Sequence, residues 1–117
     1  MVKYVPKVAE KDVVKVILQY LEAKKIFAWR NNTGAIVAGV GTNKRFFKFG
    51  LKGSSDIIGI LPDGRFLGIE CKAGKNKLSP AQDYFLKRID QNGGCAIVAY
   101  SVDDVIQSAL NKWKSNI

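Results

Sequence analysis

Two acidic residues and a lysine in the middle of the chain have types and spacing that could bind a metal ion. Asp56 precedes Glu70 and Lys72, which are separated by a single residue. Residues two apart in a strand point to the same side, so Glu70 and Lys72 would share a face. Two carboxylates beside an amine form the oxygen-rich, partly hydrated setting that Mg²⁺ prefers. A second Glu-x-Lys pair, Glu22 and Lys24, lies in a predicted helix, where residues two apart diverge.

The turn between the two strands predicts the face that Asp56 occupies. The Pro-Asp-Gly sequence at 62–64 is typical of a three-residue hairpin loop, with glycine as the left-handed closing residue. Pairing Leu61 with Arg65 then places Asp56 opposite Glu70. A two-residue loop would put the two carboxylates on opposite faces of the sheet. The loop therefore predicts that they share one face.

Apolar periodicity and turn residues predict a mixed sheet flanked by helices. A capping box at 79–82 opens the second helix, and a continuous apolar run at 95–100 indicates a strand buried on both faces. A helix between two strands implies a crossover connection, hence a parallel pair. We expect helices at 9–24, 80–91 and 101–114, strands at 26–30, 35–39, 56–61, 65–72 and 95–100, and an extended piece at 46–49.

Composition narrows the class of protein. The chain has 117 residues, with 19 Lys+Arg against 10 Asp+Glu and no histidine. The absence of histidine excludes Ser-His-Asp and Cys-His nucleophiles and His-ligated zinc. No apolar stretch is long enough to span a membrane, and the two cysteines are typical of a reducing compartment. We expect one domain covering residues 1–117.

The net charge of +9 predicts binding to a polyanion. The basic residues are spread through the folded region rather than gathered in a tail, which favours a basic surface. The alternative for the basic residues is a merely solvated face. The alternative for Asp56, Glu70 and Lys72 is a cluster on a solvated sheet face held by mutual salt bridges. The small residues at 53–55 favour a site, because they allow another backbone to approach closely. Candidate nucleic-acid contacts are Lys44, Arg45, Lys48, Lys52, Lys75 and Lys77.

Residues 53–59, 69–72 and 78–82 resemble the PD-(D/E)XK nuclease superfamily. Within it they most resemble the VRR-NUC family, the virus-type replication-repair nucleases of phages, bacteria and some eukaryotic repair enzymes. Residues 30–34 and 93–94 also fit that family, and the resemblance spans roughly residues 10–104. It departs in that Ser55 stands where the superfamily has a proline. The resemblance implies a restriction-endonuclease-like core with the order α-β-β-β-β-α-β-α.

The resemblance also implies roles for individual residues. Asp56 and Glu70 would bind the metal ion together with the backbone carbonyl of Cys71, whose side chain should point into the core. Lys72 would orient or activate the attacking water. Two further residues carry alternatives: Gln82 would support the site but also completes the capping box, and Glu10 would be an additional metal ligand but is also a favourable first-turn carboxylate.

Together with the residue types, the resemblance implies a Mg²⁺- or Mn²⁺-dependent endonuclease that hydrolyses phosphodiester bonds in DNA. By resemblance to phage members and junction resolvases, we expect branched DNA such as Holliday junctions as substrate, a homodimer, and replication or repair in the cytoplasm of a bacterial or phage-infected cell. The number of metal ions and action on RNA stay open. The alternative is a non-catalytic nucleic-acid-binding module. Trp29 and Trp113 are expected to pack, with base stacking as the alternative.

Overall fold

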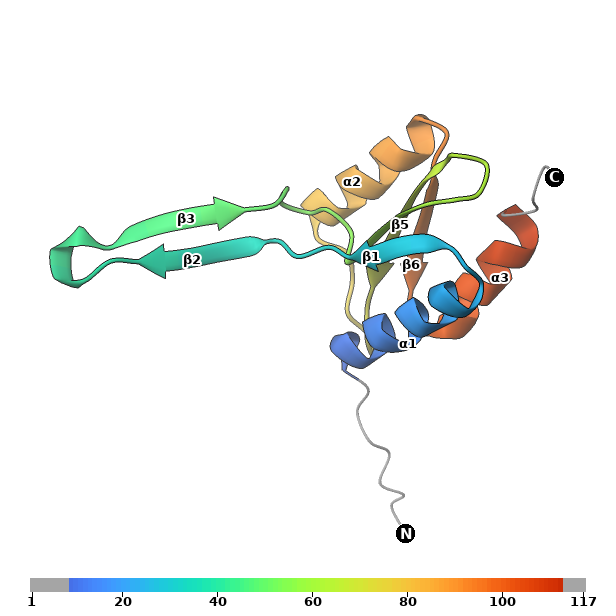
Figure 1. The fold of residues 1–117 in the computed structure, drawn as a ribbon, viewed down its shortest axis with the longest axis horizontal. Helices are drawn as coiled ribbons and strands as arrows, with labels where there is room; N and C mark the ends of the chain where they lie inside the picture. Colours follow the sequence, from blue (N-terminus) through green and yellow to red (C-terminus); the bar gives the residue numbers. More distant parts are fainter. Residues whose placement is uncertain (1–8, 113–117) are drawn as a thin grey trace, which may run out of the picture.

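The computed structural model describes residues 9–112 as a mixed α/β fold with a projecting two-stranded ribbon (Figure 1). The chain order of its elements is α1 (Glu10–Ala23), β1 (Phe27–Arg30), β2 (Gly34–Ala38), the 3₁₀ turn η1 (Gly41–Asn43), β3 (Arg45–Phe49), β4 (Ile57–Ile60), β5 (Phe66–Cys71), α2 (Pro80–Gln91), β6 (Cys95–Ala99) and α3 (Val102–Lys112).

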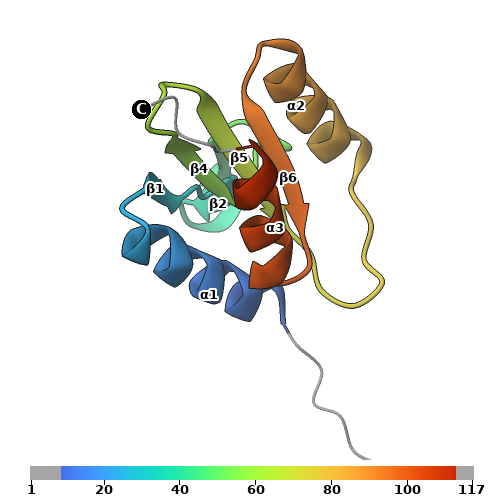
Figure 2. The same ribbon diagram turned by 90° about the vertical axis from the view of Figure 1, so that its right-hand side faces the viewer.

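The main sheet has the strand order β1-β4-β5-β6. The β1–β4 and β4–β5 pairs are antiparallel, and the β5–β6 pair, joined through α2, is parallel. Helices α1 and α3 cover one face of this sheet, and α2 packs on the other against β5 and β6 (Figure 2). The predicted fold class, a mixed sheet flanked by helices, is confirmed.

The expected order of elements is one strand short. Five strands, rather than four, precede α2, because residues 45–49 form a full strand that pairs with β2. β2 and β3 make a separate two-stranded sheet that extends beyond the end of β1 (Figure 1). Every residue of both strands is exposed. We call this segment, Gly34–Phe49, the ribbon.

The hydrophobic core lies between the main sheet and the α1–α3 layer. Helix α1 contributes side chains at helical spacing, including Ile17 and Leu21, and α3 contributes Val105. On β5 the residues alternate: Ile69 and Cys71 enter this core, as expected for Cys71, whereas Gly68 and Glu70 face α2. The core therefore fixes the face on which Glu70 and Lys72 lie.

Two expectations, the packing of Trp29 and the end of the last helix, are met only in part or not at all. Trp29 does not pack into the core; its side chain is exposed on the α2 side of β1. The last predicted helix is found up to Lys112, and Trp113 lies outside the described residues. Among the residues described, no helix combines the length and apolar character that crossing a membrane requires.

Candidate active site

The hairpin between β4 and β5 sets the register of the site. The N–H of Leu61 donates to the carbonyl of Arg65 at 2.9 Å, which confirms the predicted pairing across the three-residue loop. Gly64 closes the loop with φ of +90°, a conformation that favours glycine. The register of the two strands, continued by one position, places Asp56 opposite Glu70. Both carboxylates therefore lie on the α2 side of the sheet.

Asp56 is held by backbone groups on both sides. Its Oδ2 accepts a hydrogen bond from the N–H of Cys71 at 2.8 Å, and its carbonyl accepts one from the N–H of Asn31 at 2.7 Å. The first bond links the carboxylate directly to the strand that carries Glu70. It also fixes the backbone next to the Cys71 carbonyl.

Asn31 is a positioning residue that sequence reasoning missed. Its side-chain amide donates to Ser54 Oγ at 2.7 Å and to the carbonyl of Ser55 at 3.0 Å. These bonds connect the segment that leads into the ribbon with the segment that follows it, immediately before Asp56. In the sequence, Asn31 belongs to an Asn-Asn-Thr-Gly cluster, which indicates a turn but does not reveal this cross-link.

Glu70 is a buried carboxylate with one satisfied and one unsatisfied oxygen. Its exposed fraction is 3%, and its Oε1 accepts a hydrogen bond from Gln82 Nε2 at 3.0 Å. Its Oε2 is buried without a hydrogen-bond partner. Gln82 also completes the capping box with Ser79, so its two predicted roles occur together.

The pKa of Glu70 is raised to about 8, first by burial and then by the charge of the nearby Asp56 carboxylate and a side-chain hydrogen bond to it, whereas the positive charge of Lys72 opposes the shift. Two converging carboxylates with a buried oxygen that lacks a donor form an environment that favours a cation. The donor set consists of hard oxygen atoms, which suits Mg²⁺ or Mn²⁺. The residues present therefore fit the expected metal ion.

Lys72 lies on the same strand face as Glu70 and is 8% exposed. Within the described residues it forms no ion pair; the pairs found there are Arg65–Asp63 and Lys87–Asp83. The burial of Glu70 and Lys72 and the lack of an ion pair between them argue against the alternative of a solvated cluster held by salt bridges. Cys71 is a core residue with a neutral side chain, because its pKa is raised to about 12, mainly by burial.

Glu10 lies at the start of α1 and faces the same region from a greater distance. It accepts a hydrogen bond from Asn76 Nδ2 at 3.3 Å, and its charge adds to the raised pKa of Glu70. Residues 9–112 contain no group of three or more acidic, Cys or His side chains placed to hold one metal ion. The structure thus does not bring Glu10 to Asp56 and Glu70 as a third ligand.

Small residues let the loop before Asp56 approach α2. Gly53 has φ of +83°, and a Cβ added there would lie 2.6 Å from the carbonyl oxygen of Ala81. On β5, a Cβ at Gly68 would lie 2.4 Å from Ile89 of α2. The expectation that residues 53–55 allow a close backbone approach is confirmed.

The candidate DNA-binding residues are all exposed but lie in two places. One group belongs to the β5–α2 loop next to the site, where Asn76 bonds to Glu10 and its carbonyl accepts from the Tyr100 hydroxyl at 2.6 Å. The other group lies on the ribbon and the segment after it. Lys75 and Lys77 form the first group; Lys44, Arg45, Lys48 and Lys52 form the second.

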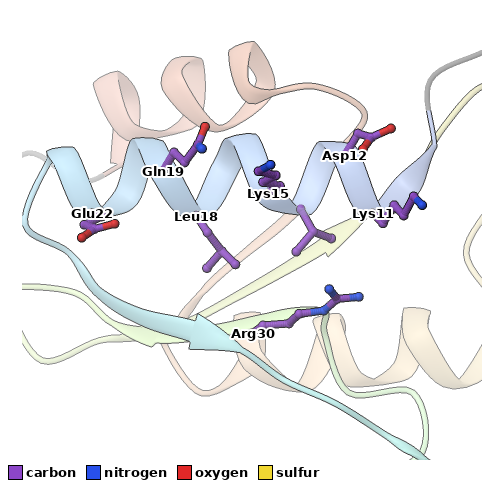
Figure 3. A pocket seen from close by; sticks show the side chains of 8 residues that line it. Lys11, Asp12, Lys15, Leu18, Gln19, Glu22 and Arg30 are labelled. Carbon is purple, nitrogen blue, oxygen red and sulfur yellow. The ribbon is translucent and has the colours of Figure 1, made fainter. Parts of the chain in front are cut away.

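A groove between α1 and β1 adds further positive charge that the sequence did not single out. Arg30 reaches from the end of β1 toward Lys11 and Lys15 on α1 (Figure 3). The groove, of about 420 Å³, also contains Asp12 and Glu22, so its charge is mixed. Arg30 lies on the opposite side of β1 from Trp29, hence away from the carboxylate pair.

The mixed sheet, its helices and the carboxylate–lysine arrangement on β4 and β5 define the restriction-endonuclease-like class of α/β proteins. The VRR-NUC domain family matches residues 8–103. The chain therefore belongs to the VRR-NUC family, a family of nuclease type. A solved structure titled "VRR_NUC domain protein" shares the fold, with a TM-score of 0.61 and 23% identity over 92% of this chain and 89% of that one. Among curated proteins no match is found.

Proposed function

We propose that this protein is a divalent-metal-dependent endonuclease that hydrolyses phosphodiester bonds in DNA. The observation that carries this proposal is the half-buried Asp56 beside the buried Glu70, whose Oε2 accepts no hydrogen bond, inside the segment that matches a nuclease-type family. A second carboxylate beside a buried one is costly without a compensating cation. A non-catalytic binding module would have no use for this costly arrangement.

Asp56 and Glu70 would hold the ion, with the carbonyl of Cys71 as a further oxygen ligand. When bound, Mg²⁺ or Mn²⁺ supplies Lewis acidity, which activates water and offsets charge on the scissile phosphate. Two carboxylates support one ion directly, and a second would need ligands from the substrate.

The remaining residues act on the substrate or hold the ligands. Lys72 places a positive charge beside Glu70, where it would stabilise the extra negative charge that develops on the phosphate and orient the attacking water. Gln82 fixes Glu70 through the bond from its Nε2, and Asn31 fixes the loop that carries Asp56. The exposed basic residues of the β5–α2 loop would bind flanking phosphates.

We further infer a branched DNA substrate such as a Holliday junction, and a homodimer. The small size of the matched domain favours a second copy, because a two-fold dimer can cut two strands symmetrically. We place the activity in replication or repair in the cytoplasm of a bacterial or phage-infected cell. The buried, reduced Cys71 and Cys95 support that compartment.

The test is cleavage of labelled linear, flap, splayed and four-way DNA with Mg²⁺, Mn²⁺ or EDTA. We expect metal-dependent cutting that favours four-way junctions. Asp56→Asn and Lys72→Met should each lower the rate by about 10²-fold or more while leaving the fold intact, as measured by circular dichroism. Binding of DNA without any cutting in either metal would instead favour the non-catalytic module. Equal cutting of a matching RNA panel would widen the substrate class.

A further inference from the structure

Among residues 9–112, no helix packs over one part of the main sheet. α2 packs against β5 and β6 and leaves the β1–β4 side of the same face uncovered. Phe27, Ile60 and Phe66 form a cross-strand row there, and the Trp29 ring lies beside that of Phe27 in a tilted arrangement, with centroids 5.3 Å apart. These four side chains have exposed fractions between 43% and 67%. We call them the open face; it lies on the same side of β4 as Asp56.

The ribbon is the second uncovered apolar surface. Side chains that alternate along a strand point to opposite faces, and both faces of the ribbon carry large apolar groups. A two-stranded ribbon alone in water is marginally stable, so this one needs a covering partner. Its exposed apolar side chains, together with Leu51 just after it, are Ile36 and Phe47 and Phe49 on one face, Val37 and Phe46 on the other, and Val40 in the turn.

The two surfaces together are large enough for a stable dimer. They contain most of the exposed large hydrophobic side chains among the described residues. With 150–250 Å² for a large aromatic side chain and about half of it exposed, they leave roughly 1,000 Å² of apolar surface per chain. A standard interface buries about 800 Å² on each partner, and the largest patch on a typical monomer is about 300–600 Å².

The chain cannot cover its own open face with its own ribbon. The ribbon leaves the sheet at the end of β1 and points away from it (Figure 1). A second copy related by a two-fold axis would cover both surfaces at once, because in such an interface each contact occurs twice. The ribbon and the open face have comparable lengths. The five-residue strands of the ribbon span about 17 Å, and the four residues of β1 in the open face span about 13 Å.

Charge argues against nucleic acid as the occupant of the open face. Within the described strands, no lysine or arginine lies on this face between the carboxylate pair and the hairpin loop. A surface that stacks bases also needs cations for the phosphates. The positive charges of the ribbon are Lys44, just before β3, and Arg45 and Lys48 on that strand, and none of them lies on the open face.

We propose that two copies of this chain dimerise by reciprocal exchange of their ribbons, so that each ribbon packs on the open face of the other copy. Because the open face adjoins Asp56, the exchange brings Arg45 and Lys48 of the partner subunit toward the carboxylate site. This inference identifies the interface of the homodimer proposed above. It rests on the proposed nuclease function only for the role of Arg45 and Lys48 of the partner subunit.

The first test is sedimentation of the full chain at several concentrations. Ile60→Ser on the open face and Phe47→Ser on the ribbon should each raise the dimer dissociation constant by at least about tenfold. Tyr84→Ser, at an aromatic on α2 that is more exposed than either, should leave it unchanged. Since all three side chains are exposed in the single chain, circular dichroism should remain native. A monomeric wild type, or equal weakening by all three variants, would overturn the proposal.

The second test identifies which surfaces meet. The chain with both Phe47→Cys and Ile60→Cys should form a covalent dimer with a bismaleimide, whereas each single variant should not; Cys71 and Cys95 are buried and should not react. Efficient cross-linking of Phe47→Cys alone would overturn ribbon exchange in favour of ribbon–ribbon pairing. Quenching of Trp29 fluorescence by DNA in a monomer, measured with Trp113→Phe so that Trp29 is the remaining tryptophan, would overturn it in favour of base stacking. None of these readouts requires cleavage, so loss of the nuclease proposal would not alter them.

Discussion

Gln82 shows how one side chain links helix stability to the site. Its Oε1 accepts from the N–H of Ser79, and its Nε2 donates to Glu70 Oε1. An amide can do both because it carries an acceptor and two donors. A capping residue is thereby placed within reach of a ligand, and the start of α2 is fixed relative to β5.

Substitutions at 79 and 82 should separate these two roles. Ser79→Ala removes one half of the capping box and should cost about 1 kcal/mol of stability with cleavage unchanged. Gln82→Ala should cost a similar amount and also weaken Mg²⁺-dependent cleavage by about 10–100-fold, because Glu70 loses its orienting donor. Urea unfolding and cleavage rates over a range of Mg²⁺ concentrations measure the two effects. Equal activity of both variants would contradict the positioning role of Gln82.

The raised pKa of Glu70 should make the metal-free protein less stable as the pH rises. The folded state keeps a proton on Glu70 up to about pH 8, whereas the unfolded chain releases it near its ordinary 4.5. Between these values the folded state binds more protons, so the free energy of unfolding should fall with pH, by at most about 1.4 kcal/mol per unit. Urea unfolding in EDTA measures it. Glu70→Gln should flatten this dependence; identical slopes in both proteins would contradict it.

At the residue scale, the sequence allowed Asp56, Glu70 and Lys72 to be brought together because strand periodicity and a single turn type decide their face. Asn31 could not be recognised in the same way. An asparagine in a turn cluster can bond to many backbone groups, and its partners at 54 and 55 depend on how the ribbon closes. Glu10 illustrates the converse: a favourable helix position did not make it a ligand in the described geometry.

At the element scale, the loop before β4 must lie almost against α2. Gly53 and Gly64 both have positive φ, but only the Gly53 position is crowded by another backbone, that of Ala81. The two glycines therefore offer a matched comparison between backbone strain alone and strain combined with a steric clash.

Gly64→Ala should cost about 1 kcal/mol from the strained backbone alone. Gly53→Ala should cost more, because its Cβ would lie 2.6 Å from the Ala81 carbonyl oxygen and must displace the loop or α2. The displacement should also lower cleavage, since Asp56 follows the loop directly. Thermal unfolding and cleavage of both variants measure this difference. A smaller loss of stability for Gly53→Ala than for Gly64→Ala would contradict this prediction, because it would mean that the loop moves away from Ala81 at little cost.

The strands themselves were predictable, but the sheet to which each belongs was not. Ile36 and Phe47 have the apolar, β-forming character of buried strand residues, yet they lie on an uncovered ribbon. Trp29 was expected to pack because large aromatics usually do. Whether it packs depends on how far α2 extends across the sheet, which is a property of tertiary packing and not of local pattern.

At the scale of the whole molecule, the net charge of +9 can be related to basic residues at known places in the fold. Lys44 and Lys48 lie on the ribbon, and Lys75 lies in the loop beside the carboxylates, so two separate regions could hold phosphates. A general excess of positive charge attracts DNA from any side, whereas direct contacts release counterions one by one. The salt dependence of binding distinguishes these cases.

Two variants that change the net charge equally, from +9 to +7, make that distinction. Lys44→Gln with Lys48→Gln should lower the slope of log K against log salt by about 1.8, since each lost phosphate contact on duplex DNA lowers it by about 0.9. Lys24→Gln with Lys25→Gln, at the far end of α1, should leave the slope unchanged. Fluorescence anisotropy with four-way DNA, in a background of Asp56→Asn that prevents cutting, provides the measurement. Equal slopes for the two variants would mean that net charge, and not the ribbon, governs binding.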